Sequence, residues 1–457
     1  MTFAPPFNRR FVLAASLGLG ASAAVAQAAD SKSARDKVLA AAHDAAPGLH
    51  ADAGLDQTAT LQAAIDAAAA RDAPLMLPPG TFRVSDLRLR SGTRLIGAAG
   101  TTTLLFGGGA AFITADKCDG LVLQDLVLDG AFQPFDDSRG EGLLTISRSK
   151  HIALRSLTIR HSAKSGVALV DTGGRLAALT IHDILEAGVK SLDAEGLDIT
   201  GNTITNCGNN GILVWRTEPG EDGTIVSGNR IEKIRNSAGG SGEYGNGINV
   251  FRAGSVLVTG NRIADCAYTA IRGNAASNIQ IVANSCERLG EVAIYCEFGF
   301  EGALIANNVV DFAAAGISVT NFNEGGRLAV IQGNLIRNLF RREHEKEDKR
   351  GEGISVEADA VVSGNTIEGA PTVGIQIGWG PFMRDVAATG NVVRRARVGI
   401  AISAAPETGA CLIANNLISD AKDGAIRSMT EGVVFGPDLA REPLAGERMT
   451  VAGNVAV

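Results

Sequence analysis

The chain has 457 residues, of which 45% are hydrophobic and 20% charged, and its formal net charge at pH 7 is −7. This negative balance argues against general nucleic-acid binding through bulk charge, so no nucleic-acid partner is predicted. Six cysteines without a CxxC spacing do not make the framework of a disulfide-rich domain.

The N-terminal segment has the pattern of an export signal. Two arginines, Arg9 and Arg10, precede a modest apolar run over residues 14–25, and Ala-Gln-Ala follows at 26–28. This pattern predicts a twin-arginine signal peptide over residues 1–28 that is removed by cleavage.

Such a signal has consequences for location and partners. We expect the export machinery to carry the folded chain to the periplasm or the medium, so that the protein is periplasmic or secreted. Loss of the two signal arginines changes the formal net charge from −7 to −9. No second hydrophobic span follows, so no membrane association is expected after cleavage. A membrane anchor is the weaker alternative, because the apolar run is short and contains Gly18 and Gly20.

Two helical segments are predicted before the first strands. Residues 29–55 read as a linker with a short Ala-rich helix, and residues 56–72 read as a capping helix. The apolar positions of the second helix recur at helical spacing, at Leu61, Ala64, Ile65 and Ala68. We expect this helix to cover the apolar core and the unpaired backbone at the open end of a sheet structure that occupies residues 75–457.

The segment from Asp56 to Leu105 carries a family resemblance. A capping helix, the sequence LPPGTF at 77–82 and Leu-Ile-Gly at 95–97 resemble the opening of the pectate-lyase-like superfamily. That resemblance implies a right-handed parallel β-helix, and many members of the superfamily act on acidic polysaccharides. The whole chain is also similar to the family described as twin-arginine-translocated uncharacterised repeat proteins, which implies fold and export route but no chemistry.

Two short sequence words recur along the rest of the chain. The second word, close to Gly-Ile-x-Val, begins twelve times between Gly142 and Gly424, mostly 21 to 25 residues apart. A fixed period of this size predicts a solenoid. The first word is Gly-Asn or a degenerate copy of it, with its asparagine at Asn202, Asn229, Asn261, Asn284, Asn308, Asn334, Asn365, Asn391, Asn416 and Asn454.

The apolar runs between these words favour strands. They are short and alternating, as in Ile248 and Val250, and they show no helical period, which argues against a leucine-rich repeat. We therefore predict an all-β, single-stranded, right-handed parallel β-helix (a pectin-lyase-like solenoid) of twelve coils, forming one domain over residues 56–457. Gly and Asn tolerate positive φ at tight corners, and stacked Asn side chains can hydrogen-bond as a ladder. A binding role for these asparagines is the alternative.

Cysteines and metal ligands give weak signals. Cys207 and Cys266 occupy a slot that holds aliphatic residues in other coils, whereas Cys286 and Cys296 leave a disulfide or a metal pair open. No metal site and no cofactor are predicted. Calcium is the alternative, held by acidic turn residues, and imidazole ligation is a further one. The residues concerned are Asp125, Asp129, Asp136, Asp137, His151, His161 and His182.

Three insertions break the repeat period and point to a binding face. They fall at residues 131–141, 232–246 and 338–352, each before the same strand of its coil. Insertions on one face of a repeat protein often mark its binding surface. The charged run at 341–350 reads as a solvated loop or short helix, with a lid over the groove as the alternative.

Between the last two insertions, strand alternation assigns side-chain directions. Inward positions are Ile248, Val250, Ile271, Ile294, Cys296, Ile317 and Val319. Outward positions are Asn249, Phe251, Arg272, Asn274, Tyr295, Glu297, Ser318 and Thr320, with Trp215 added by the preceding coil. The outward positions therefore concentrate polar and aromatic groups in one zone.

This zone suggests lyase or epimerase chemistry on an acidic glycan. Arg272 could bind a uronate carboxylate, Tyr295 could move a proton, near Arg272 or Lys190, and Glu297 could act as acid or base. We name these three as candidate catalytic residues. The candidate substrate-binding residues are Trp215, Asn249, Phe251, Asn274, Asn321, Asn323, Glu324 and Trp379.

Other functions remain open at this point. Glycoside hydrolysis would need two facing carboxylates, such as Glu297 with Glu324 or Glu357. Arg272 and Glu297 could equally form an ordinary surface ion pair. The acidic triad of polygalacturonases and the calcium-plus-arginine set of pectate lyases are not evident, which weakens the enzyme case. The alternative function is a non-catalytic carbohydrate-binding or cell-envelope scaffold protein.

Overall fold

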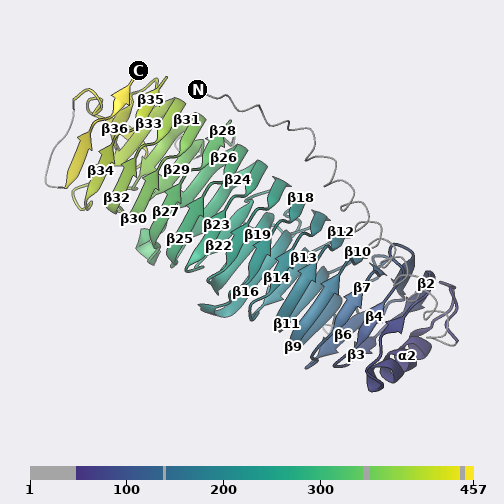
Figure 1. The fold of residues 1–457 in the computed structure, drawn as a ribbon. Coiled ribbons are helices and arrows are strands. Elements are labelled where there is room, and N and C mark those ends of the chain that lie inside the picture. Colours follow the sequence, from purple (N-terminus) through teal and green to yellow (C-terminus); the bar gives the residue numbers. More distant parts are fainter. Residues whose placement is uncertain (1–47, 137–139, 343–349, 443–447) are drawn as a thin grey trace, which may run out of the picture.

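The structure is a computed structural model that describes residues 48–136, 140–342, 350–442 and 448–457. The predicted signal peptide (1–28) and most of the predicted linker (29–55) lie outside these residues, as does Asp137. The described chain winds into a long rod of short parallel strands, with the single α-helix at one end (Figure 1). Each full coil contributes strands to three lengthwise sheets, which we call the first, second and third sheet in the order in which a coil visits them.

The bounds of the strands follow this coil pattern. The first sheet contains β3 (Leu87–Leu89), β6 (Ile113–Asp116), β9 (Gly142–Arg155), β11 (Ser165–Ala177), β13 (Ala187–Leu192), β16 (Asn210–Glu221), β19 (Asn246–Gly254), β22 (Ile271–Asn274), β24 (Ser285–Glu297), β26 (Val309–Val319), β29 (Glu352–Val356), β31 (Thr366–Ile377), β33 (Val392–Ser403) and β36 (Ile426–Thr430). Six of these strands bend around a corner into a neighbouring sheet: the ends of β9 and β11 belong to the second sheet, and the beginnings of β24, β26, β31 and β33 belong to the third. The second sheet contains β1 (Leu75–Met76), β4 (Arg94–Ile96), β7 (Val122–Gln124), β14 (Asp198–Thr200), β17 (Ile225–Ser227), β20 (Leu257–Thr259), β23 (Ile279–Val282), β25 (Glu301–Ala306), β27 (Arg327–Gln332), β30 (Ala358–Ser363), β32 (Arg384–Thr389), β34 (Cys411–Ala414) and β38 (Met449–Ala452). The third sheet contains β2 (Gly80–Val84), β5 (Thr102–Phe106), β8 (Val127–Asp129), β10 (Thr158–Ser162), β12 (Thr180–Ile184), β15 (Thr203–Cys207), β18 (Arg230–Ile234), β21 (Arg262–Cys266), β28 (Leu335–Arg337), β35 (Leu417–Ser419) and β39 (Val455–Ala456).

The predicted right-handed parallel β-helix is confirmed, and it has about 14 turns where we predicted twelve. The twelve Gly-Ile-x-Val words correspond to the first-sheet strands from β9 to β36. The two additional coils contain β3 and β6 and precede the first word. These two strands keep the apolar alternation but lack the glycine with which the word begins. Among the described strands, β36 and β37 (Val433–Phe435) form the antiparallel pair, at the less regular C-terminal end.

The predicted capping helix is confirmed as α2 (Thr58–Ala70). It buries Leu61, Ile65 and Ala68 against the first coil, where the sheets would otherwise expose their core. The helix start is stabilised by Asp56, whose Oδ1 accepts hydrogen bonds from the Thr58 amide and hydroxyl at 2.9 and 2.6 Å.

The asparagine ladder is also confirmed. From Asn202 to Asn454 each Asn Nδ2 donates to the Oδ1 of the asparagine in the next coil at 2.9–3.0 Å, and each backbone N–H donates to the same oxygen. The structure also shows which residue of each pair forms the corner. The positive φ at the corner belongs to the residue before the ladder asparagine, such as Gly228 (φ 64°) or Asn415 (φ 58°). The ladder asparagine itself is therefore free to point inward.

Replacing one rung of the ladder should lower stability strongly. In Asn308→Ala, the amide and Nδ2 of buried Asn284 lose their acceptor, so we expect the free energy of unfolding to fall by about 2–4 kcal/mol. Urea denaturation followed by circular dichroism measures this change. Asn323→Ala is the matched control, because Asn323 is exposed and should shift the value by less than about 0.5 kcal/mol. Equal shifts in both variants would contradict a stabilising ladder.

The cysteines are all buried with free thiols, which confirms Cys207 and Cys266 as packing residues. The possible disulfide or metal pair of Cys286 and Cys296 is wrong. Cys286 pairs with Ile263 in the third sheet, whereas Cys296 pairs with Gly273 in the first sheet. Burial raises the pKa of both thiols to about 12, so they behave as small apolar groups.

Candidate functional site

The predicted site lies on the outer surface of the first sheet, across β16, β19, β22 and β24. The parallel register aligns its residues in two columns along the rod. One column contains Leu213, Asn249, Arg272, Tyr295 and Ser318. The neighbouring column contains Trp215, Phe251, Asn274 and Glu297. The alternation of inward and outward residues is therefore as predicted.

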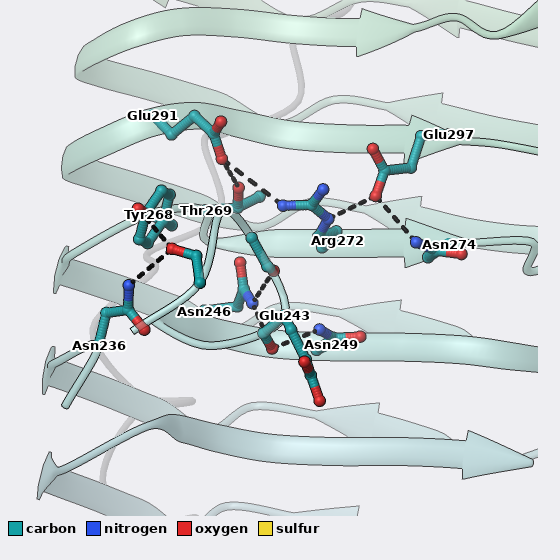
Figure 2. Close-up of polar contacts among 12 residues, drawn as sticks. Asn236, Glu243, Asn246, Asn249, Tyr268, Thr269, Arg272, Asn274, Glu291 and Glu297 are labelled. Atoms are coloured by element: carbon teal, nitrogen blue, oxygen red, sulfur yellow. Dashed lines mark hydrogen bonds and ion pairs between the residues drawn. The ribbon is translucent and has the colours of Figure 1, made fainter. Parts of the chain in front are cut away.

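The outward residues are nevertheless covered, which the prediction missed. Asn249, Arg272 and Glu297 are only 5%, 9% and 3% exposed. The last residues of the insertion at 232–246 lie over the strands and cover these side chains (Figure 2). The insertion is held down by three contacts: Asn249 Nδ2 donates to Glu243 O, Asn246 Nδ2 to Gly242 O, and the Tyr268 hydroxyl to Gly240 O.

The closest approach of this insertion is at Gly242. A Cβ built on Gly242 would lie 1.9 Å from Arg272 Nη1, and the backbone φ of 149° also favours glycine. The backbone of the insertion therefore rests directly on the guanidinium group, and glycine is the residue that allows this contact.

Arg272 is held between two carboxylates, as Figure 2 shows. Its Nε donates to Glu297 Oε1 at 2.6 Å, and its Nη1 lies 3.6 Å from Glu291 Oε2. Asn274 Nδ2 donates to the same Glu297 oxygen at 3.0 Å. The interpretation as an ordinary surface ion pair is wrong, because the two partners are 10% and 3% exposed. A guanidinium already neutralised in this way is a weak binder of a uronate carboxylate.

The insertion at 338–352 reaches the same network. Arg350 Nη2 lies 3.1 Å and Arg342 Nη1 3.9 Å from Glu291 Oε1. Arg342 also lies 5.7 Å from the ring centre of Tyr268, whose hydroxyl bonds Gly240 in the insertion at 232–246. Glu291 therefore links the two insertions across the coils between them. The predicted lid falls mostly on residues 343–349, outside the described residues.

Tyr295 is poorly suited to remove a proton. Its ring lies 5.1 Å from the Arg272 guanidinium carbon. Burial raises the pKa of Tyr295, and the Glu297 carboxylate raises it further. A phenol with a raised pKa stays protonated at neutral pH, so it could donate a proton but would be a weak base.

Two hollows flank the insertion and share Trp215. The smaller, of about 210 Å³, is lined by Trp215, Gly242, Glu243, Asn249, Phe251, Arg272 and Asn274. The larger, of about 300 Å³, is lined by Glu141, Ser165, Glu186, Ala187, Lys190, Asn209, Asn210, Leu213, Trp215, Ala238 and Tyr244. Because Trp215 lines both, we call the two hollows together the groove.

Trp215 is fixed in place at the centre of the groove. Its Nε1 donates to Asn249 Oδ1 at 3.3 Å, and the Phe251 ring packs against it edge-on at 6.0 Å between ring centres. One face of the indole is thus positioned by protein contacts. An aromatic ring held among amides and carboxylates is a common platform for a polar ligand with an apolar face.

The larger hollow contains Lys190, which sequence reasoning named only as a possible neighbour of Tyr295, together with groups that it did not place in the site. Lys190 Nζ lies 3.2 Å from Glu141 Oε2, and Ser165 Oγ donates to Glu186 Oε2 at 3.2 Å. Burial raises the pKa of Tyr244, and the neighbouring Glu243 carboxylate raises it further. The one available signal was position, because Glu141 and Tyr244 both lie in the insertions that break the repeat.

Several predicted binding residues line neither hollow. Asn321, Asn323 and Glu324 lie at a one-turn helix, η1 (Phe322–Glu324), one coil beyond Glu297. Asn321 Oδ1 accepts from the Phe298 amide at 3.2 Å, so its role is structural.

Trp379 and Glu357 also lie outside the groove. Trp379 follows β31 and forms a bridge with Phe382. Burial raises the pKa of Glu357, whose Oε2 accepts from the Phe322 amide at 2.7 Å. Glu297, Glu324 and Glu357 line neither hollow, so the groove does not contain the carboxylate pair that glycoside hydrolysis would need from them.

Asp129, one of the residues considered for calcium, already has several partners. Asp129 accepts from Arg160 Nε at 2.8 Å and from the Ala131 amide at 2.9 Å, and it contacts His161 Nδ1 at 2.9 Å. His151 and His182 pair with separate aspartates. Within the described residues no group of three or more His, Cys, Asp or Glu side chains is arranged to hold a metal ion.

Comparisons with known proteins agree with this architecture. A family model described as "Right handed beta helix region" matches residues 165–335 and 220–383. The chain is a right-handed parallel β-helix. No curated protein matches its sequence. None of the helices in the described part of the chain has the length and hydrophobicity needed to cross a membrane.

Two solved structures illustrate the fold. The N-terminal fragment of the bacteriophage Phi29 gene product 12 superposes with a TM-score of 0.50 at 15% identity, over 86% of this chain and 72% of that one. A PL6 alginate lyase in complex with a trisaccharide superposes with a TM-score of 0.50 at 13% identity, over 87% and 93% of the two chains. At such identities the similarity establishes the β-helix fold alone.

Proposed function

We propose that this protein binds a polysaccharide along the groove. The observation that carries the proposal is the position of Trp215, which lines both hollows and is held by Asn249 and Phe251. Two hollows on either side of one indole suit successive sugar units of a chain, because sugar rings present apolar faces that stack on aromatic side chains. The half-buried amides of Asn209 and Asn274 add hydrogen-bonding groups for hydroxyls.

The charge of the groove bears on the kind of glycan. Its cations are Lys190, 3.2 Å from Glu141, and Arg272, 2.6 Å from Glu297. Both positive charges are therefore already paired with a carboxylate. The acidic glycan predicted from the sequence would need to compete with those carboxylates, whereas a neutral glycan would not. We retain the acidic glycan as a proposal that is tested beside the neutral one.

Affinity electrophoresis tests the binding proposal. The protein would be run in native gels that contain alginate, pectate, a glycosaminoglycan, or a neutral glucan. We expect retardation in at least one of these gels, and retardation by neutral glucan would favour the uncharged substrate. Unchanged mobility in all four gels, for a protein with an intact β-sheet spectrum, would refute polysaccharide binding in the groove.

Lyase or epimerase chemistry is the second candidate function, and the larger hollow favours it. Lys190, Glu186 and Tyr244 line that hollow together. Lys190 could pair with a uronate carboxylate, and Glu186 could accept the C5 proton. In elimination, the electron pair of the C5–H bond forms the C4–C5 double bond while the C4–O bond breaks. Tyr244, kept protonated by its raised pKa, could give its proton to the leaving oxygen.

Two sets of variants separate the two possible sites of this chemistry. We expect Tyr244→Phe to lower the rate of unsaturated uronate formation, measured by ultraviolet absorbance, by about 100-fold or more. The matched variant Tyr295→Phe, combined with Arg272→Ala, tests the residues predicted from the sequence. Turnover that survives the double variant would reject Arg272 and Tyr295 as catalytic residues. Retained glycan binding without any turnover would favour the non-catalytic scaffold.

We also propose that the protein is exported to the periplasm or the medium through the twin-arginine pathway. The support is the pattern of residues 1–28 in the sequence. N-terminal sequencing of the protein recovered from the periplasmic fraction would test this proposal. A chain found only in the cytoplasm, with residue 1 or 2 at its start, would contradict it.

A further inference from the structure

A second surface of the rod is distinguished by its lack of charge. It lies on the second sheet, from β17 to β38, where two adjacent columns of outward positions are uncharged, beside a further outward column that includes Asp359 and Asp385. The first column contains Ile225, Leu257, Gln280, Leu304, Val330, Val361, Ala387, Leu412 and Thr450. The second contains Ser227, Thr259, Val282, Ala306, Gln332, Ser363, Thr389, Ala414 and Ala452. All eighteen positions are described, none is charged, and we call this surface the uncharged face.

The absence of charge is not a general property of the rod. Charged residues make up 20% of the chain. The third sheet, which follows in every coil, carries charges at its outward positions, among them Arg230, Glu232, Arg262 and Arg337. Outward positions of a solvated sheet normally carry such residues, because they keep the sheet soluble. Eighteen uncharged outward positions on nine successive strands therefore call for a partner surface.

The uncharged face has a ridge of exposed aliphatic side chains and a hollow beside it. Val330, Val361 and Leu412 are 37%, 41% and 40% exposed. A shallow hollow of about 420 Å³ is lined by Leu304, Leu328, Val330 and Val361 among others. Of the described residues, its one charged lining residue is Asp359, which is paired with Arg327 and Arg384. Side chains of a second surface could therefore enter the hollow, while the ridge packs against them.

Paired charges border the face on both sides. On one edge Arg327 bonds Glu301 and Asp359, and Arg384 Nη2 bonds Asp359 at 2.6 Å. On the other edge Arg337 Nη2 pairs with Asp311 at 2.7 Å. An apolar centre with a rim of satisfied polar groups is the usual anatomy of a protein–protein interface.

Charge and area both favour a second copy of this chain as the partner. The chain has a formal net charge of −7, so two copies repel each other over most of their surfaces, and the uncharged face lets them meet without facing like charges. Eight strand steps of about 4.8 Å make the face roughly 38 Å long. The two columns and the uncharged turn that adjoins them are together about 15 Å wide. The resulting area of about 600 Å² per copy is at the lower end for specific interfaces.

We propose that two copies of this protein associate through the uncharged face, second sheet against second sheet. The groove lies on the first sheet, so both surfaces can be occupied at the same time. An interface of this area should give a dissociation constant in the micromolar range, on the order of 1–100 µM.

Sedimentation of the full chain over a range of concentrations tests the proposal. We expect the native protein to shift from monomer to dimer, and Val330→Lys to weaken the dimer at least about tenfold, because each copy then buries a charge at the centre of the interface. Leu185→Lys is the matched control, since Leu185 is 48% exposed and lies outside the face. An equimolar mixture of Val330→Lys and Val330→Glu should recover the dimer.

The outcomes distinguish this proposal from others. A native protein that remains monomeric up to about 100 µM, or a Val330→Lys variant that dimerises as the native protein does, would overturn it. Polysaccharide retardation by a monomeric Val330→Lys variant would show that the groove works independently of the dimer. Val330 is exposed, so circular dichroism of the variant is expected to match that of the native protein and to exclude misfolding as the cause.

Discussion

Arg272→Met is expected to cost the protein about 3–5 kcal/mol of unfolding free energy. The substitution leaves Glu297, 3% exposed, without the guanidinium that lies 2.6 Å away, and it removes one cation from Glu291. Buried carboxylates without a partner are strongly destabilising, because water no longer solvates them. Denaturant unfolding monitored by circular dichroism measures the loss.

Arg288→Met is the matched control for Arg272→Met. The Nε of Arg288 lies 2.7 Å from Asp265 Oδ1, a distance close to that of the Arg272 pair. The side chains of Arg288 and Asp265 are, however, 44% and 37% exposed. Solvent screens such a pair, so the control should lose no more than about 1 kcal/mol. Similar losses of unfolding free energy in the two variants would mean that burial does not make the ion pairs of Arg272 more important for stability than an exposed pair. Arg272→Met should weaken the binding of a neutral glycan only if the substitution also displaces the insertion at 232–246, which rests on Arg272.

Trp215→Ala is expected to weaken polysaccharide binding by about 30-fold, because truncation of a central aromatic residue typically costs about 2 kcal/mol or more. The loss should be seen as reduced retardation in glycan-containing native gels. Trp215 is half-buried at the surface, so the fold is expected to tolerate the change.

Trp379→Ala provides the control within the same chain, which has two tryptophans. Trp379 lines neither hollow, so its truncation should leave glycan retardation unchanged. Comparable losses in both variants would mean that binding is spread over the rod and is not centred on the groove. An unchanged affinity in Trp215→Ala would reject the proposed platform directly.

Much of the fold could be predicted because the repeat is written in local sequence. Each Gly-Asn word specifies a corner and each Gly-Ile-x-Val word a first-sheet strand, so the coils from β9 onward were placed correctly. The coils of β3 and β6 were missed because their strands lack the word. The sequence left open which residue of each pair has the positive φ, since both Gly and Asn tolerate it.

The site was only partly predictable, for a different physical reason. Alternation along a strand gave the direction of Arg272 and Glu297 correctly, but their burial depends on the path of an insertion that has no period. The contact at Gly242 is one that no spacing rule foresees. Tyr244 was missed for the same reason, because it lies in that insertion and not in a strand. Outward direction and exposure are separate properties, and only the first can be read from alternation.

The asparagine ladder also bears on how the length of this protein can change. Each rung bonds to the rungs of the adjacent turns, and its Nδ2 also donates to a backbone carbonyl of the preceding turn, so the bonds of the ladder join neighbouring turns. Duplication or deletion of one whole turn would join one asparagine to another in an unchanged geometry. Evolution could therefore lengthen or shorten such a protein in units of one turn, while a change of a few residues is tolerated only where a loop leaves the rod.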